Sequence, residues 1–321
     1  MKISVIVPVY NEEQSIACLL DSLSRQTLRP SEIVIADAGS TDQTAAIIAT
    51  SEQTMVAIHL IRAGVAFPGR ARNVAAAQAN NEWLAFIDAG INPEPDWLES
   101  LARRAQLPDD VDVVYGSYEP VVDTLFKQCA VMAYVAPPVE MDGRSIRSRS
   151  VASVLMKRKV WQAVGGFPEH LRSAEDLLFM DKIDASDFRV AHASNALVHW
   201  QVKGTPWLTF KRFVTYARNN MRAGLWRQWQ GPILQRYGFL LAAGLPVFWF
   251  GVKWLLVPLL LWVLMLAGRA AVALWRNRGC YPAGPSRNVV RLLVLIPLIA
   301  LIDAATISGT LQWALKDKAG L

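Results

Sequence analysis

The stretch ISVIVPVYNEE at residues 3–13 decides the fold of this chain. It starts as an apolar, β-branched run, which predicts a strand buried on both faces, and it ends in polar loop residues. Similar runs occur at 32–36, 56–61, 83–87 and 111–115, and helical patterns lie between them near 13–24, 42–51, 70–80 and 95–106. This alternation predicts an α/β domain with a mostly parallel sheet and right-handed crossovers.

Polar residues follow three of these strands at the carboxyl end, where parallel sheets bind their ligands. They occupy residues 8–13, 37–42 and 88–92. The first of these segments reads PVYNEE and lacks a G-x-G-x-x-G, so a nicotinamide-dependent oxidoreductase is excluded. The sequence therefore predicts a ligand site of another kind along this edge of the sheet.

Composition and charge divide the chain into two parts. The 321 residues are 53% hydrophobic and only 19% charged, which excludes a disordered chain, a collagen and a coiled coil. Residues 1–199 contain 18 basic and 25 acidic side chains, whereas residues 200–321 contain 15 basic and two acidic ones. Because the positive charge accompanies the apolar part, a lipid surface is favoured over nucleic acid as the anionic partner. Three widely spaced cysteines form neither a disulfide framework nor a zinc motif.

The C-terminal part has the pattern of a membrane domain. Residues 201–236 carry seven basic side chains and no acid, opposite an apolar helical face, which predicts amphipathic interfacial helices. The alternative is a helix packed on the soluble domain. Residues 237–321 are expected to form the membrane domain itself. Within it, the apolar residues 238–275 would extend ~57 Å as one helix, against a hydrocarbon core of ~30 Å, so they predict a hairpin.

We expect three spans, at about 238–251, 253–275 and 289–313. The positive-inside rule favours three because it places the arginine-rich loop between the last two spans inside. The short arms also leave a re-entrant hairpin open. Asp303 in the last span is either functional or paired with Lys253 or Arg269. The apolar run at the N-terminus is too short for a signal peptide, so we expect the N-terminal domain in the cytosol.

Three further motifs complete a set of five. PGRARN (68–73) opens a helix, FIDAG (86–90) closes a strand, and GGFPEHLRSAEDLLF covers 165–179. With PVYNEE (8–13) and DAGSTD (37–42), and in this order, they resemble the family 2 glycosyltransferases. The resemblance covers residues 1–200. It implies a GT-A domain, the Rossmann-like fold of nucleotide-diphospho-sugar transferases, followed here by the interfacial and transmembrane helices.

The resemblance also implies a nucleotide-sugar site at the strand ends. Asp37 would contact the nucleotide, and Arg70 or Arg72 the diphosphate, since arginine pairs well with phosphate oxygens. The other residues implied are Pro8, Tyr10 and Glu12 of the first loop and Gly166 of the GGF turn.

Each of these residues has a structural alternative. Asp37 could serve turn chemistry, and Ser40, Thr41 and Asp42 are expected as caps of the next helix. Glu12 could favour a helix N-terminus, the arginines could be a solvated pair, and Gly166 could end a helix.

The FIDAG motif departs from the family pattern. Members usually carry D-x-D, whose second Asp holds a divalent metal, but this chain reads Asp88-Ala89-Gly90. Three outcomes stay open. Mn²⁺ or Mg²⁺ could bind through Asp88 and donors elsewhere such as His199. Arg70, Arg72 or Arg144 could instead neutralise the leaving diphosphate. The third outcome is an inactive enzyme.

The resemblance assigns catalysis to the acidic pair of the fifth motif. Asp176 would be the general base that deprotonates the acceptor hydroxyl, and Glu175 would orient the acceptor or donor sugar. The helix-capping alternative makes Ser173 the N-cap, with Asp176 at the third helical position. Attack from the face opposite the leaving nucleotide would invert the anomeric centre.

Arginines in DGRSIRSR (142–149) are candidates for binding the acceptor, because a phosphorylated lipid would suit Arg144, Arg147 and Arg149. A solvated loop is the alternative. The Q-x-x-R-W signature of processive synthases is absent, which favours addition of a single sugar.

Together these observations predict an inverting, non-processive glycosyltransferase of the bacterial inner membrane, with its catalytic domain in the cytosol. It would move a sugar from a nucleotide-diphosphate sugar to a lipid, a polyprenyl phosphate or a lipid-linked saccharide. The alternative is an inactive pseudo-enzyme that serves as a membrane-bound scaffold.

Overall fold

The computed structural model describes residues 1–51, 56–141 and 144–318. They form two compact units. The first contains residues 1–121 and 138–201, and the second contains residues 122–137 and 202–321. Each unit is described by itself below.

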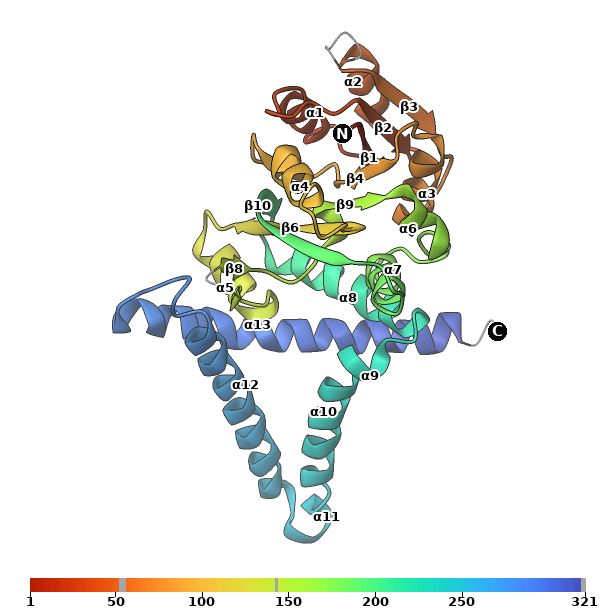
Figure 1. The fold of residues 1–321 in the computed structure, drawn as a ribbon. Coiled ribbons are helices and arrows are strands. Elements are labelled where there is room, and N and C mark those ends of the chain that lie inside the picture. The colour runs from red at the N-terminus through yellow and green to blue at the C-terminus, as the bar shows by residue number, and fades with distance from the viewer. Residues whose placement is uncertain (52–55, 142–143, 319–321) are drawn as a thin grey trace. The chain divides into compact units, whose positions relative to one another are not determined.

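The first unit is built on an eight-stranded mixed sheet (Figure 1). Its strand order is β3-β2-β1-β4-β9-β6-β10-β5. The strands are β1 (Ile3–Val9), β2 (Glu32–Asp37), β3 (Ile58–Arg62), β4 (Trp83–Phe86), β5 (Ile91–Pro93), β6 (Val113–Val121), β9 (Val154–Lys157) and β10 (Val190–Gln201). A separate two-stranded sheet pairs β7 (Val139–Met141) with β8 (Arg144–Ile146).

Helices connect these strands and cover the sheet. They are α1 (Ile16–Ser24), α2 (Thr44–Thr50), α3 (Pro68–Gln78), α4 (Trp97–Ala105), α6 (Arg158–Ala163) and α7 (Glu175–Asp184). All five predicted strands and all four predicted helices are present, so the predicted α/β fold class is confirmed. β3, β2, β1 and β4 run parallel, whereas β9 is antiparallel to both β4 and β6 and makes the sheet mixed.

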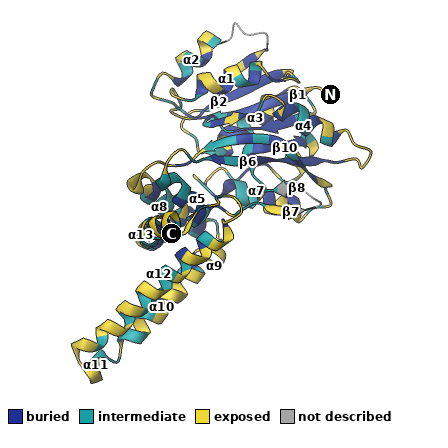
Figure 2. Ribbon diagram, turned by 90° about the vertical axis from the view of Figure 1, so that its left-hand side faces the viewer, coloured by how far each residue is buried: buried dark blue, intermediate teal, exposed yellow. Residues whose placement is uncertain are grey.

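The sheet is apolar on both faces, as the continuous hydrophobic runs predicted. Alternate residues of β1 enter two different clusters: Val5 and Val7 pack with α1 and α4, while Ile6 packs with α3 and α7. Figure 2 shows the central strands as the most buried part of this unit. Burial on both faces fixes the register of β1 and therefore the position of the loop that follows it.

The second unit is helical. It contains α5 (Leu125–Tyr134), α8 (Pro206–Arg222), α9 (Trp226–Trp229), α10 (Gly231–Gly244), α11 (Val247–Phe250), α12 (Leu256–Arg276) and α13 (Pro285–Gln312). Three helical stretches in the described residues are long and apolar enough to span a membrane: Gly231–Phe250, Val252–Arg276 and Pro285–Asp317. Residues 122–137 join this unit, a grouping that no sequence pattern indicated.

Asp303 lies in α13 and is fully buried. Of the two predicted partners, the structure selects Arg269 of α12, whose Nη2 lies 3.0 Å from Asp303 Oδ1 and whose Nη1 contacts Oδ2. Tyr237 of α10 donates its hydroxyl to Asp303 Oδ2 at 3.2 Å. Asp303 therefore ties the two arms of the hairpin to α13.

Candidate active site

The loops that follow β1 and β2 are joined by hydrogen bonds at the carboxyl edge of the sheet. The Asn11 amide donates to Ser40 Oγ at 2.9 Å, and the Thr41 amide donates to Asn11 Oδ1 at 2.8 Å. The expectation that Ser40 and Thr41 cap α2 is therefore wrong, because both brace the neighbouring loop. Of the three residues expected as caps, Asp42 serves the helix start, accepting from the Thr44 amide at 3.0 Å. Asn11, with φ 52°, was not singled out from the sequence.

The residues predicted to bind the nucleotide surround these loops. Asp37 ends β2, is buried, and accepts from the Ser40 amide at 2.9 Å. Pro8 lies in β1, and Tyr10 is half exposed just beyond it. The Glu12 carboxylate accepts a short hydrogen bond from Ser15 Oγ at the start of α1. Asp37 and Glu12 thus both accept local hydrogen bonds that stabilise the loops. Their roles in binding a nucleotide stay predictions.

Arg72 joins three parts of the site. Its Nη2 lies 2.7 Å from Asp88 Oδ1, just beyond β4, and its Nη1 lies 2.7 Å from Glu175 Oε1 at the start of α7. The Arg72 side chain is only 6% exposed, and its guanidinium lies 5.4 Å from the Phe167 ring centroid. Arg72 is therefore no free cation for a diphosphate, whereas Arg70, two residues earlier, is exposed.

The acidic pair opens α7 from a strained backbone. Ala174 precedes it in the left-handed region with φ 70°, and the predicted cap by Ser173 does not form, since its hydroxyl has no hydrogen-bond partner among the described residues. Glu175 Oε2 is likewise buried and unpartnered within that part of the chain. Asp176 Oδ1 accepts from the Leu177 amide at 2.9 Å.

Burial controls the protonation of both carboxyls. Desolvation raises the pKa of Glu175 above its ordinary value, although the charge of Arg72 opposes this. Desolvation raises the pKa of Asp176 in the same way, again against Arg72. A carboxylate with a raised pKa is a stronger base, which is what proton abstraction from a hydroxyl requires.

The GGF turn is held by a residue that the sequence analysis missed. Asn73 Nδ2 donates to the Phe167 carbonyl at 2.9 Å, and Asn73 Oδ1 accepts from the Phe167 amide at 2.9 Å. Gly166 has φ 66°, and a Cβ there would lie 2.6 Å from Asn73 Oδ1. The glycine is thus required by the turn and by close packing, one residue before the ring that contacts Arg72.

Comparison with known proteins identifies this constellation. The profile described as "Glycosyl transferase family 2" matches residues 4–152, which include Asp37, Arg72 and Asp88. This part of the chain belongs to glycosyltransferase family 2. The first four predicted motifs lie within this match, whereas the fifth, at residues 165–179, lies beyond it. The roles of individual residues are not tested by the match.

Two curated relatives illustrate the similarity. Poly(ribitol-phosphate) beta-N-acetylglucosaminyltransferase TarS of Staphylococcus aureus is 31% identical over 216 residues, which are 63% of this chain but only 36% of that protein. The O-antigen chain rhamnosyltransferase RfbN of Salmonella typhimurium is 26% identical over 224 residues, 66% of this chain and 70% of that protein. The chain thus matches about a third of the length of TarS.

Solved structures show the same GT-A fold. The mannosyltransferase PcManGT of Pyrobaculum calidifontis, in complex with GDP-Man and Mn²⁺, superposes with a TM-score of 0.56 at 20% identity, covering 99% of this chain and 88% of that one. S. aureus TarS 1–349 in complex with UDP-GlcNAc gives 0.51 at 20% identity, covering 100% and 92%.

Gly90 stands where the family resemblance leads us to expect the second Asp of D-x-D, the expected metal ligand. A Cβ at Gly90 would lie 3.7 Å and 3.8 Å from the two Glu12 carboxylate oxygens. The Glu12 carboxylate therefore lies next to the position where the second Asp of a D-x-D motif would be. Asp88 and Glu12 fit a hard cation that keeps waters and leans on phosphates, although the described residues contain no cluster of three metal-ligating side chains. His199 is engaged elsewhere, with Nε2 2.6 Å from Glu94 Oε1.

Two of the predicted acceptor arginines are paired within the first unit. The Arg147 side chain is buried, and its Nη2 lies 2.8 Å from Glu119 Oε2. Arg149 Nη2 lies 2.6 Å from Asp184 Oδ2 at the end of α7. The solvated-loop alternative is therefore wrong for Arg147. Arg144 begins β8, and its side chain is not among those that the structure describes.

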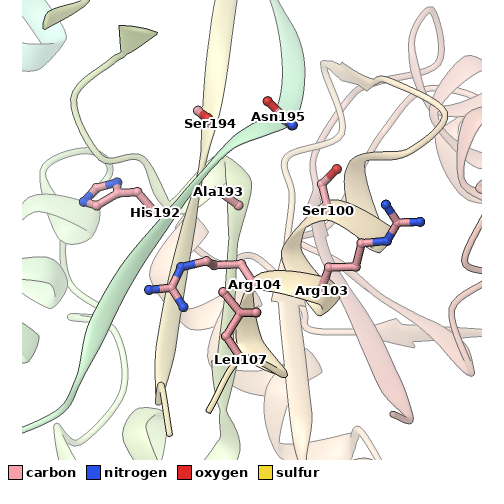
Figure 3. Close-up of a pocket in the computed structure, with 8 residues that line it drawn as sticks. All are labelled: Ser100, Arg103, Arg104, Leu107, His192, Ala193, Ser194 and Asn195. Atoms are coloured by element: carbon pink, nitrogen blue, oxygen red, sulfur yellow. The ribbon is translucent and has the colours of Figure 1, made fainter. Parts of the chain in front are cut away.

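The pocket drawn in Figure 3 lies away from these residues. It has a volume of about 250 Å³ and is formed by α4, by Leu107 two residues beyond it, and by the beginning of β10. β10 runs parallel to β6, so its beginning lies at the edge of the sheet opposite to the candidate site. The two arginines that line it, Arg103 and Arg104, are paired with Glu99 and Asp109. This pocket therefore lies outside the candidate site.

Proposed function

We propose that the chain is an inverting, non-processive glycosyltransferase that acts on a membrane-associated acceptor at the cytosolic face. The observation that carries the proposal is the buried link from Asp88 through Arg72 to Glu175, which joins the donor edge of the sheet to the acidic pair. Family 2 membership supports transfer of a sugar from a nucleotide sugar. The apolar helices support an acceptor at the membrane, such as a lipid, a polyprenyl phosphate or a lipid-linked saccharide.

Asp176 is the proposed base. Its Oδ1 is engaged by the Leu177 amide, which leaves Oδ2 to take the proton of the acceptor hydroxyl as that oxygen attacks the anomeric carbon. Glu175 is held through Oε1 by Arg72, and its buried Oε2 would accept from a sugar hydroxyl. Bringing donor and acceptor together in one orientation supplies the proximity term, which can be worth ~7–11 kcal/mol.

The donor edge would hold the nucleotide. Asp37 would accept from the base or ribose, and exposed Arg70 would approach the phosphates. Asp88 and Glu12 would hold Mn²⁺ or Mg²⁺, which when bound would offset the charge of the leaving diphosphate. Solved relatives carry UDP-GlcNAc in one case and GDP-Man with Mn²⁺ in another, so both nucleotides are reasonable first probes.

The test separates binding from chemistry. Thermal unfolding of the detergent-purified full chain is measured with UDP, GDP, dTDP or CDP, each with Mn²⁺, Mg²⁺ or EDTA. A nucleotide at 100 times its Kd should stabilise the chain by ~2.7 kcal/mol. Asp176→Asn should retain this shift and lose sugar transfer, while the matched control Asp181→Asn, exposed on the same helix, should retain both.

The competing scaffold function rests on the replacement at Gly90. It predicts no nucleotide shift under any condition, and a biological phenotype that survives Asp176→Asn. A shift in the wild type with transfer lost only in Asp176→Asn would exclude it.

A further inference from the structure

The hairpin formed by α10, α11 and α12 has almost no protein around it within its own unit. Only 6% of the most apolar window of Gly231–Phe250 and 11% of that of Val252–Arg276 are buried. Figure 2 shows exposed residues along the whole hairpin. The largest apolar side chains are most exposed at its tip, at Phe248, Trp249 and Val252. An apolar surface of this extent matches the hydrocarbon of a bilayer.

α13 differs from the hairpin because 44% of its apolar window is buried. Figures 1 and 2 both show α10 and α12 extending away from α13 instead of running alongside it. Much of the burial comes from α8. A Cβ at Gly309 would lie 2.8 Å from Ala217 Cβ, so the glycine permits close contact of the two helices.

Both ends of α13 are held by helices outside the hairpin. Just beyond its C-terminal end, the Asp317 carboxylate accepts from Arg218 Nη2 at 2.6 Å and from Arg222 Nη2 at 2.7 Å, both on α8. Near its N-terminal end, Arg291 donates from Nη2 to Gln128 Oε1 of α5 at 3.0 Å. Arg291 is itself buried, so this contact is an integral part of the unit.

The chain connections place α5 and α8 on the same side of a membrane as the sheet. α5 begins four residues after β6 ends at Val121, and α8 begins five residues after β10 ends at Gln201. Even fully extended, such linkers reach only ~14–18 Å, which is less than the ~30 Å hydrocarbon core. Neither helix can therefore begin on the far side, and neither is among the helical stretches of the described residues that are long and apolar enough to cross.

The same comparison applies to α13. Arg291 and Asp317 are separated by ~39 Å of helix, so a crossing helix would place them on opposite faces. Their partners on α5 and α8 lie on one face. We propose that α13 does not cross the membrane but lies along its surface, and that the hairpin alone enters, from the side of the catalytic unit, and returns. The proposal rests on the membrane association that is part of the proposed function.

The depth of the hairpin follows from the Asp303 cluster. Tyr237 and Arg269 mark the level at which the two arms leave α13. From there the arms continue for ~20 Å to Phe250 and ~25 Å to Val252, short of the ~30 Å core. The tip would thus end inside the far leaflet, and Lys253 would extend its ammonium toward the far headgroups.

Single-cysteine labelling in membranes tests this topology. The background keeps the buried Cys129 and replaces the exposed Cys18 and Cys280 with serine. Separate variants then carry one further cysteine each beside the buried Cys129, namely Cys18, Cys280, Lys316→Cys, Gln312→Cys or Lys253→Cys. A membrane-impermeant maleimide is applied to intact cells and to inside-out vesicles, with nucleotide-induced stabilisation as the check on folding. Using both Lys316→Cys and Gln312→Cys guards against damage to the Asp317 contact.

We expect Lys316→Cys and Gln312→Cys to be labelled from the same face as Cys18 and Cys280. Lys253→Cys should be labelled from neither face until detergent is added. Labelling of both C-terminal positions from the opposite face would show that α13 crosses and would overturn the proposal. Labelling of Lys253→Cys from the far face would overturn the re-entrant hairpin. A chain absent from the membrane fraction would refute membrane association itself, which is a different result.

Discussion

Arg72→Gln tests whether the buried guanidinium holds the candidate site together. The substitution keeps a polar side chain of similar length but removes the charge shared by Asp88 and Glu175. It leaves Glu175 buried with neither carboxylate oxygen paired to a cation, since Oε2 already has no partner among the described residues. We therefore expect a loss of stability that comes mainly from Glu175.

The exposure of the two carboxylates sets the magnitude. The Asp88 side chain is 41% exposed, so its half of the interaction is screened and contributes little. The Glu175 side chain is 6% exposed, and breaking a buried pair costs ~3–5 kcal/mol. At ~2–4 °C per kcal/mol, Arg72→Gln should lower the Tm by roughly 6–20 °C.

A double-mutant cycle with Glu175→Gln separates this pairing from simple loss of packing. If Glu175 is the main source of the cost, the double variant should recover ~0.5–3 kcal/mol relative to the sum of the two single variants. The unfolding free energies are measured by thermal and denaturant unfolding of the full chain in detergent. Arg72→Lys is the conservative control, and it should lose less because it keeps the charge.

The pH dependence gives a second readout. Without Arg72, the pKa of Glu175 rises further, because the group that opposes desolvation is gone. The folded variant then binds a proton more tightly than the unfolded chain, so its stability falls as pH rises from ~4 through the raised pKa. Arg72→Gln should therefore be less destabilising at pH 5 than at pH 8. Additive costs in the cycle together with a pH-independent difference would refute the reasoning.

Three smaller predictions follow from other contacts. Gly166→Ala should cost ~1–3 kcal/mol in unfolding assays, because its Cβ would meet Asn73 Oδ1 at 2.6 Å at a positive φ. Gly309→Val should lower the Tm of the full chain, since even a Cβ there lies 2.8 Å from Ala217 Cβ; an unchanged Tm would mean that α8 and α13 do not pack. In pH profiles of sugar transfer, kcat/KM should fall as the pH is lowered through the pKa of Asp176. Because that pKa is raised, the fall should come at a higher pH than for an ordinary Asp, and an acid limb near pH 4 would contradict the role of Asp176 as base.

The sequence predicted the strands and their loops because those signals are local. Apolar runs of five or six residues and the polar residues after them locate the carboxyl edge without knowledge of the partners. Long-range contacts were out of reach. Arg72 looked like a cation on a helix start, and its role depends on Glu175, which is 103 positions away. Asn73 ends the PGRARN motif, but nothing local indicated its contacts to Phe167, 94 positions away.

The membrane segments show the same division. Hydropathy identified three segments of sufficient length, because it depends only on composition. Hydropathy could not predict how the third segment, α13, lies relative to a membrane. That orientation depends on the hydrogen bond between Arg291 and Gln128, 163 positions apart, and on the contact of Asp317 with α8. Residues 122–137 carried no signal for joining the helical unit, since α5 resembles any short amphipathic helix.

The charge balance of the site bears on two of the three outcomes left open by Gly90, a divalent metal and arginine. The Arg72 guanidinium is one cation among three carboxylates, those of Asp88, Glu175 and Asp176. The Glu12 carboxylate lies next to Gly90 and adds a fourth. A nucleotide diphosphate would add further negative charge there. Binding therefore needs an additional cation, either Arg70 or a divalent metal.

Asp88→Asn distinguishes these two sources, because removing one carboxylate has opposite effects in each case. If a metal is used, the variant loses a ligand, and nucleotide-induced stabilisation in Mn²⁺ should fall to its value in EDTA. If arginine alone serves, the variant removes a repulsive charge, and nucleotide binding in EDTA should tighten, by up to tenfold per 1.4 kcal/mol gained. Because the excess of carboxylates exceeds what one exposed arginine can offset, we expect the first result. Tighter binding of Asp88→Asn in EDTA would refute it.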